Sequence, residues 1–252
     1  MKIVSFENNI FSIKGKILLD LNFESLNDVI INTSYYFKGK IFVPLSNYKN
    51  GIINIYNSNF LQANKLSHKI INAGYILGIA SFSDKDKGIN YILVSNKEGI
   101  FTYDLNYYYI YYKFIPPKKE KDNQEILFNE ACITRKDDQV ILIGTSFNHG
   151  YFYFWDFDNK KLINITKMDC DISNICLWDN NYIFASFYNS KSEFGLINLK
   201  DMTIEEIKIE NDKNEKLGKG RCVKLLKRES NYNYLISISF NGELNLYKII
   251  KQ

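Results

Sequence analysis

Short runs of β-branched and aromatic residues recur along this chain, and polar turns containing Gly or Asn separate them. In one example, residues 142–146 lead through the turn His149-Gly150 into residues 151–156. Runs of this length and composition, bounded by such turns, are typical of β-strands joined in hairpins. No stretch requires a helix, so the sequence predicts an all-β protein.

The same unit, made of a β-type run, a turn and a second β-type run, occurs five times. The first and second runs of these units are residues 42–46 and 53–56, 92–95 and 101–104, 142–146 and 151–156, 183–186 and 195–198, and 235–239 and 244–247. Five residues in the second runs are taken as equivalent: Tyr56, Tyr103, Trp155, Ile197 and Tyr247. They follow one another at steps of 47, 52, 42 and 50 residues. Such a period, with a hairpin in each unit, predicts a β-propeller.

The fullest unit resembles the WD-repeat family of β-propellers. It runs from Gly144 through the turn at Gly150 to the pair Trp155-Asp156. Tyr103-Asp104 is a weaker copy of this pair, and Leu66-Ser67-His68 resembles the Gly-His element of the family, with Ser in place of Gly. The resemblance implies a WD-repeat-like propeller that acts as a scaffold for protein partners.

The predicted blades are residues 16–57, 60–104, 107–156, 160–198 and 202–248, each ending with the strand that carries the equivalent residue. Residues 3–6 and 10–13 predict the last two strands of a further, partial blade. We therefore expect one propeller domain over residues 1–252, with six blades. A seven-bladed, open or truncated propeller is the alternative.

Cysteine positions support this register. Cys132, Cys176 and Cys222 precede Trp155, Ile197 and Tyr247 by 23, 21 and 25 residues. We expect these three cysteines to be small buried residues on an inner strand of each blade. Their isolation from other ligands gives no spacing typical of a metal site.

Composition narrows the classes of partner. The net charge is +4, and only three of the basic residues are arginines, whose side chains suit phosphate and guanine recognition best. Nucleic acid and membrane surfaces are therefore not expected partners, although a phosphoinositide- or RNA-binding propeller remains the alternative function. No apolar leader stands at residues 1–9, and no run approaches the roughly 18 apolar residues of a membrane span. We expect a cytoplasmic protein, with the nucleus as a second location.

Catalytic chemistry finds little support. The two histidines, His68 and His149, lie in no nucleophile motif, and no phosphate-binding Gly-rich loop is present. The sequence predicts a non-catalytic scaffold, a subunit of a larger intracellular complex, with no catalytic residue, cofactor or metal and with binding residues still unknown.

Three further segments are interpreted as surface loops or as core. The polar inserts 116–125 and 210–220 carry balanced charges and are expected as solvated loops between first and second strands. The aromatic tract 107–114 is interpreted first as packing between blades, and second as a surface for a partner.

Overall fold

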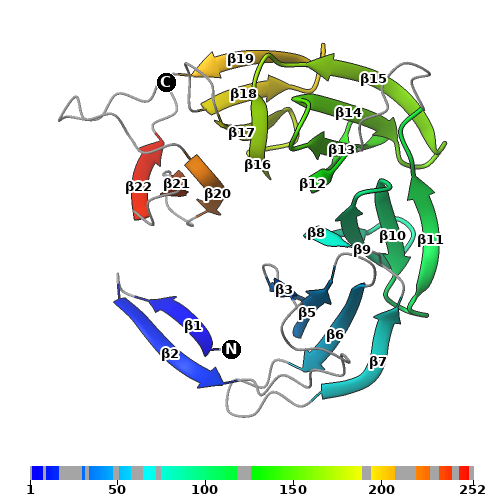
Figure 1. The fold of residues 1–252 in the computed structure, drawn as a ribbon, viewed down its shortest axis with the longest axis vertical. Helices are drawn as coiled ribbons and strands as arrows, with labels where there is room; N and C mark the ends of the chain where they lie inside the picture. Colours follow the sequence, from blue (N-terminus) through cyan, green and yellow to red (C-terminus); the bar gives the residue numbers. More distant parts are fainter. Residues whose placement is uncertain are drawn as a thin grey trace. The chain divides into compact units, whose positions relative to one another are not determined.

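The computed structural model shows an all-β chain. It describes residues 2–7, 10–16, 30–31, 34–47, 51–57, 65–71, 75–117, 126–188, 194–207, 220–227, 233–239 and 244–249. Within these ranges the regular elements are all strands, twenty-two in number, and they form six sheets (Figure 1). The prediction of an all-β protein is confirmed.

Strands that follow one another in sequence lie side by side in each sheet. The first hairpin is β1 (Lys2–Glu7) and β2 (Ile10–Lys16). The second sheet holds β3 (Ile30–Ile31), β4 (Tyr35–Phe37), β5 (Lys40–Ser46), β6 (Gly51–Asn57) and β7 (Lys65–Ile71), in the order β3-β5-β6-β7 with β4 also paired to β5. The third holds β8 (Ile76–Asp84), β9 (Ile89–Asn96), β10 (Ile100–Asp104) and β11 (Tyr109–Phe114).

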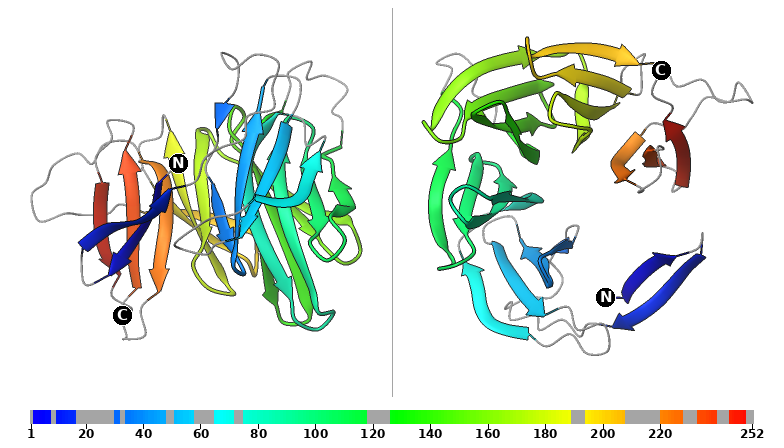
Figure 2. Two further views of the ribbon diagram at one scale, coloured as in Figure 1. Left: turned by 90° about the horizontal axis from the view of Figure 1, so that it is seen from below. Right: turned by 180° about the vertical axis from the view of Figure 1, so that it is seen from behind.

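The remaining three sheets follow the same order. The fourth holds β12 (Phe128–Lys136), β13 (Gln139–Ser146), β14 (Tyr151–Asp156) and β15 (Lys161–Lys167), drawn in green in Figure 2. The fifth holds β16 (Asp171–Leu177), β17 (Tyr182–Tyr188), β18 (Phe194–Asn198) and β19 (Thr203–Ile207). The sixth holds β20 (Gly220–Lys227), β21 (Asn233–Ser239) and β22 (Leu244–Ile249).

Contacts divide the chain into two compact units. Unit 1 comprises residues 1–97 and 101–112, and unit 2 comprises residues 98–100 and 113–252. In unit 1, one core cluster joins Phe42, Ile53 and Ile55 of the second sheet to Ile92 and Val94 of the third. Sheets that bury apolar residues against each other in this way form a layered core.

In unit 2, two pairs of sheets pack against each other in the same way. One cluster joins Ile143 and Phe154 of the fourth sheet to Ile175 and Ile183 of the fifth. Another cluster joins the fifth sheet to Leu235 of the sixth. The first strands β12, β16 and β20 contact one another in sequence. In unit 2 the sheets therefore stack face to face, with first strands together.

The equivalent positions occupy one place in five of the six sheets. Tyr56, Tyr103, Trp155, Ile197 and Tyr247 lie in β6, β10, β14, β18 and β22, the third strands of their sheets. The prediction that these strands close each blade is wrong, because a fourth strand pairs with four of them. In the register, Tyr56 faces Lys65, Trp155 faces Leu162 and Ile197 faces Ile204.

The shift of boundaries has a physical cause. A fourth strand has a neighbour at only one edge, so its side chains are half-buried or exposed, as the pattern of β15 shows. Its sequence therefore lacks the apolar run that marks an inner strand. As a consequence, the inserts 116–125 and 210–220 come, along the chain, between the last strand of one sheet and the first strand of the next, and not between first and second strands. Residues 118–125 and 208–219 lie outside the described residues.

The predictions for the N-terminal hairpin and the cysteines can be compared with the structure directly. Residues 3–6 and 10–13 do pair, with Val4 opposite Ile13 in β1 and β2. Cys132 and Cys176 are buried on the first strands β12 and β16, as predicted. Cys222 lies in the first strand β20.

Tyrosine stands in place of tryptophan at three of the five equivalent positions, Tyr56, Tyr103 and Tyr247. The hydroxyls of Tyr56 and Tyr103 are buried and have no hydrogen-bond partner among the described residues. Burial raises the pKa of Tyr103 to about 12. A buried hydroxyl without a partner keeps its desolvation cost and gains nothing in return.

Tyr103→Phe should leave the free energy of unfolding unchanged or raise it by up to about 1 kcal/mol, because it removes only an unpartnered hydroxyl. The neighbouring buried residue Thr102 is the matched control. Its hydroxyl donates to the carbonyl of Tyr112 at 3.0 Å and accepts the N–H of Tyr112 at 3.1 Å. Thr102→Val should cost about 1–3 kcal/mol in chemical denaturation. A loss of stability in Tyr103→Phe equal to that in Thr102→Val would contradict this account.

Gly150→Ala should destabilise the fourth sheet. Gly150 has a φ of 64°, and an added Cβ would lie 2.6 Å from the carbonyl oxygen of Met168 and closer still to that of Cys170. Gly39 has a φ of 73° with open space around the Cβ position, so Gly39→Ala measures the backbone strain alone, about 1 kcal/mol. Gly150→Ala should cost roughly 1–3 kcal/mol more. Equal unfolding midpoints for the two variants would refute the clash.

Candidate functional site

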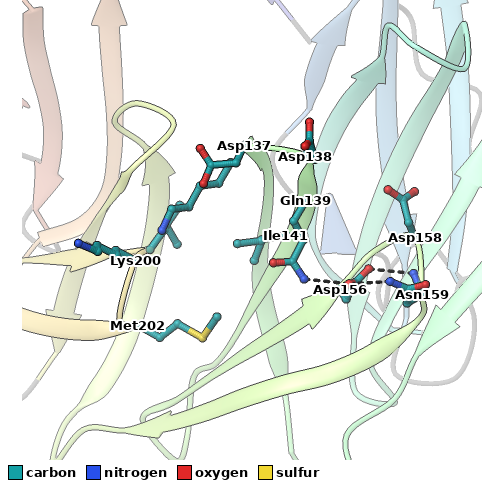
Figure 3. A pocket seen from close by; sticks show the side chains of 11 residues that line it. Asp137, Asp138, Gln139, Ile141, Asp156, Asp158, Asn159, Lys200 and Met202 are labelled. Carbon is teal, nitrogen blue, oxygen red and sulfur yellow. Dashed lines mark hydrogen bonds between the residues drawn. The ribbon is translucent and has the colours of Figure 1, made fainter.

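A pocket of about 530 Å³ lies between the fourth and fifth sheets, within unit 2 (Figure 3). Three turns form it: β12–β13 at residues 137–138, β14–β15 at residues 157–160, and β18–β19 at residues 199–202. Its volume is within the range of about 300–1,000 Å³ that is common for ligand pockets. We call this pocket the notch.

The carboxylate of Asp156 holds two of these turns in place. Its Oδ1 accepts the backbone N–H of Asn159 at 2.8 Å, and its Oδ2 accepts the side-chain amides of Asn159 at 2.9 Å and Gln139 at 2.8 Å. The N–H of Phe157 donates to the carbonyl of Val140 at 2.9 Å. Asp156 thus ties the end of β14 to the start of β13.

The same bond recurs in the neighbouring sheets. The N–H of Asn106 donates to Asp104 Oδ1 at 2.6 Å, and the N–H of Lys200 donates to Asn198 Oδ1 at 2.8 Å. Side-chain oxygens of Asp and Asn satisfy turn N–H groups two or three residues ahead, which explains these residue types at this place. The pairs Tyr103-Asp104, Trp155-Asp156 and Ile197-Asn198 therefore perform one structural task.

The last residue of each of these turns has a left-handed backbone. Tyr108, Lys160 and Met202 have φ values of 56°, 57° and 58°. Such values are uncommon for residues other than glycine. The shared conformation makes these three residues structurally equivalent.

The notch has an apolar floor and a charged rim. Ile141 and Leu199 are buried, and Met202 packs against the cluster that contains them. Asp137 and Asp138 are exposed at the rim. Asp158, Lys136 and Lys200 complete the charged part of the lining.

Asp156 is ionised at neutral pH and serves structure. Burial by itself would raise the pKa of its carboxyl, but the hydrogen bonds from Asn159 and Gln139 lower the pKa below its usual value overall. A carboxylate with both oxygens engaged in this way is a poor proton donor or acceptor. The role of Asp156 is therefore structural: it holds in place the turns that line the notch.

The histidines lie elsewhere. His149 is in the β13–β14 turn, at the end of the sheet opposite to the notch, with its ring centroid 6.4 Å from that of Tyr151. It is half-buried rather than fully solvated. His68 lies in β7. In the described part of the chain, no group of three or more His, Cys, Asp or Glu residues is placed to hold a metal ion.

The aromatic tract is more exposed than packing between blades would allow. Tyr107 is 74% exposed and Tyr109 is 50% exposed, and their ring centroids lie 6.0 Å apart. Ile110 is exposed as well, whereas Phe114 is buried. The interpretation as core is right for Phe114 and wrong for Tyr107 and Tyr109, because Tyr107 lies in the β10–β11 turn and β11 is the outer strand of its sheet.

Sequence reasoning missed the notch. Its lining comes from three separate turns, and none of them carries a motif. The available signal was the alignment of units on Trp155-Asp156, which places residues 156–160 and 198–202 in equivalent turns.

Comparisons with known proteins give the fold and no sequence family. No protein-family model and no curated protein matches the chain. A chain in the crystal structure of the mitotic checkpoint complex is similar with a TM-score of 0.59 at 9% identity, over 96% of this chain and 79% of that one. BBS1N, in its complex with ARL6DN, is similar with a TM-score of 0.54 at 11% identity, over 89% of this chain and 68% of that one.

These structures are β-propellers of the WD40 type. The present chain accordingly has the β-propeller fold, with four-stranded antiparallel sheets. None of the described residues forms a helix long and apolar enough to cross a membrane.

Asp156→Asn should destabilise the protein at neutral pH by roughly 1–3 kcal/mol, because the new amide group presents N–H groups where Asn159 and Gln139 donate. The lowered pKa of Asp156 means that its contribution is present above the ordinary carboxyl value of 3.8 and is lost as the pH falls through the folded-state pKa. Chemical denaturation should therefore show a smaller difference in the free energy of unfolding between wild type and variant below about pH 4 than at neutral pH.

Asp138→Asn is the control for this experiment, because Asp138 is exposed at the rim of the same notch. It should change stability by less than about 0.5 kcal/mol at either pH. If the loss of stability caused by Asp156→Asn were the same at both pH values, the charge of Asp156 would not contribute to stability.

Proposed function

We propose that this chain is a divergent WD-repeat β-propeller that acts as a non-catalytic scaffold for protein partners, as a subunit of a larger intracellular complex. In this proposal residues 1–252 form one propeller domain located in the cytoplasm. Two similar propellers support it, since one is part of the mitotic checkpoint complex and the other was solved bound to ARL6DN. Because a shared fold does not by itself imply a shared function, the proposal rests mainly on the surface of this chain.

The observation that carries the proposal is the exposed aromatic surface where the β10–β11 turn leads into β11. We call Tyr107, Tyr109 and Ile110 the β11 patch. All three are large apolar side chains exposed to solvent, and Tyr107 and Tyr109 are neighbours. Tyrosine is enriched at protein interfaces because it offers a large rigid area with a polar tip and few rotamers to immobilise.

The position of the patch strengthens this interpretation. β11 ends the order of its sheet, β11-β10-β9-β8. Outer strands of natural sheets usually carry charged residues that discourage association. β15, the fourth strand of the next sheet along the chain, begins and ends with exposed lysines. The outer strand β11 begins instead with tyrosine and isoleucine.

The double variant Tyr107→Ser, Tyr109→Ser should lose partner binding. Tagged wild-type protein, captured gently from cells that express it, should elute in one large peak with stoichiometric companion proteins. The variant should retain these companions at least about tenfold less, because truncation of interface tyrosines commonly costs more than 1 kcal/mol. Both side chains are exposed, so the melting temperature should not change.

Tyr36→Ser is the matched control, because Tyr36 is another exposed tyrosine, 59% exposed, on β4. It should keep the companions. A wild-type protein that elutes as a monomer without companions, or a patch variant that keeps them all, would contradict the proposal. Companions that disappear after ribonuclease treatment would favour the RNA-binding alternative instead.

A further inference from the structure

The chain contains an internal counterpart of the notch, and that counterpart is occupied by one of its own aromatic rings. Lys40 begins β5 and faces Phe37 across the hairpin, as Gln139 begins β13 and faces Lys136. By the same register, Phe42 corresponds to Ile141.

The partner side of the two places also corresponds. Leu105 and Leu199 each donate their N–H at 2.8 Å to a carbonyl at the start of the second strand of their sheet, that of Asn90 in β9 and that of Asn181 directly before β17. Three positions later stand Tyr108 and Met202, both with a left-handed backbone.

In unit 1, the ring of Tyr108 fills the space between the second and third sheets. Lys40 Nζ donates to the hydroxyl of Tyr108 at 2.6 Å and lies 5.2 Å from the centre of its ring. Tyr108 packs against the cluster that contains Phe42 and Leu105. The chain itself thus shows that a tyrosine ring, an apolar floor and an ammonium group fit together at this place in the fold.

In unit 2, the corresponding residues leave the space open. Met202 is slimmer than a tyrosine, and Ile141 is smaller than the Phe42 that it replaces. Gln139 donates to Asp156 of its own sheet instead of reaching across. These three differences account for the notch of about 530 Å³.

We propose that the notch binds a tyrosine side chain of a partner protein, in a segment that places a lysine or arginine beside that tyrosine. The proposal rests on the scaffold function and names the chemistry of one partner. Ile141 and Leu199 provide the same kind of floor that Phe42 and Leu105 provide for Tyr108. The thioether of Met202 would contact the ring, an arrangement that favours aromatic ligands.

The charged rim selects what accompanies the tyrosine. Lys136 and Lys200 line the notch, so an ammonium group can meet the hydroxyl as Lys40 meets Tyr108. Four aspartates stand against these two lysines in the lining, which leaves the notch net acidic. A basic residue next to the tyrosine would therefore be attracted, and a neighbouring carboxylate would be repelled.

Methionine methyl groups offer a direct readout. The chain has three methionines, Met1, Met168 and Met202, so a protein labelled with ¹³C at the methionine methyls gives a spectrum that Met202→Leu can assign. The probe is the capped peptide Lys-Tyr-Lys, and its control is Lys-Ala-Lys. The tyrosine peptide should shift the Met202 methyl signal upfield in a saturable way, through the ring current, while Met168 stays unchanged.

The proposal is overturned if the Met202 signal does not move, or if the two peptides move it equally, which would indicate attraction of charge alone. A second variant tests the internal counterpart. Met202→Tyr with Gln139→Lys copies the pair of unit 1 and should fill the notch. Saturation transfer from this folded protein to the tyrosine peptide should fall at least about tenfold. Undiminished transfer would also overturn the proposal.

Failure of this inference can be told from failure of the scaffold function. If the notch-filled variant keeps all companions in the capture experiment while the β11 patch variant loses them, the scaffold function stands and the notch is not the partner site. If wild-type protein has no companions, the scaffold function fails, and the peptide titration still decides what the notch binds.

Discussion

A side-chain oxygen at the end of the third strand, seen in the third, fourth and fifth sheets, is the interaction on which this structure depends most. In β10, β14 and β18 it accepts the first N–H groups of the following turn and so returns the chain as a fourth strand. The same turn ends in a left-handed residue. In two of the three turns that residue, Tyr108 or Met202, packs against a core cluster shared with another sheet of the same unit. Fold and candidate site therefore share a cause: the bond that completes each sheet also decides which residue stands in the space beside it.

The sequence revealed the inner strands and misplaced the outer ones. The runs that end at Tyr103 and Trp155 are buried on both faces, so their composition is unmistakable. The side chains of β15 and residues 203–205 of β19 are half-buried or exposed, and the polar composition of these strands fits the first strand of the next unit equally well. The same uneven burial explains the tyrosines of β11, because aromatic content cannot tell an outer strand from a covered one.

The notch was beyond sequence reasoning for a different reason. A repeat is usually examined for the residues that its copies share, whereas the notch arises from residues that its copies do not share. Tyr108 and Met202 differ, as do Lys40 and Gln139, and only the structure shows that each pair stands at one place. In a repeated fold, a departure from the pattern at one copy is therefore as informative about binding as the pattern is about architecture.

The buried cysteines of this protein can report how often its stacked sheets separate. Cys132 and Cys176 lie on the neighbouring first strands β12 and β16, inside stacked sheets, whereas Cys170 is half-buried in the bend between β15 and β16. An alkylating reagent can reach the first two only while the sheets are apart, so their labelling rate measures how often the stack separates. Cys170 can be labelled without separation of the sheets, so its labelling rate serves as the reference. Separation of the fourth and fifth sheets can be followed in this way.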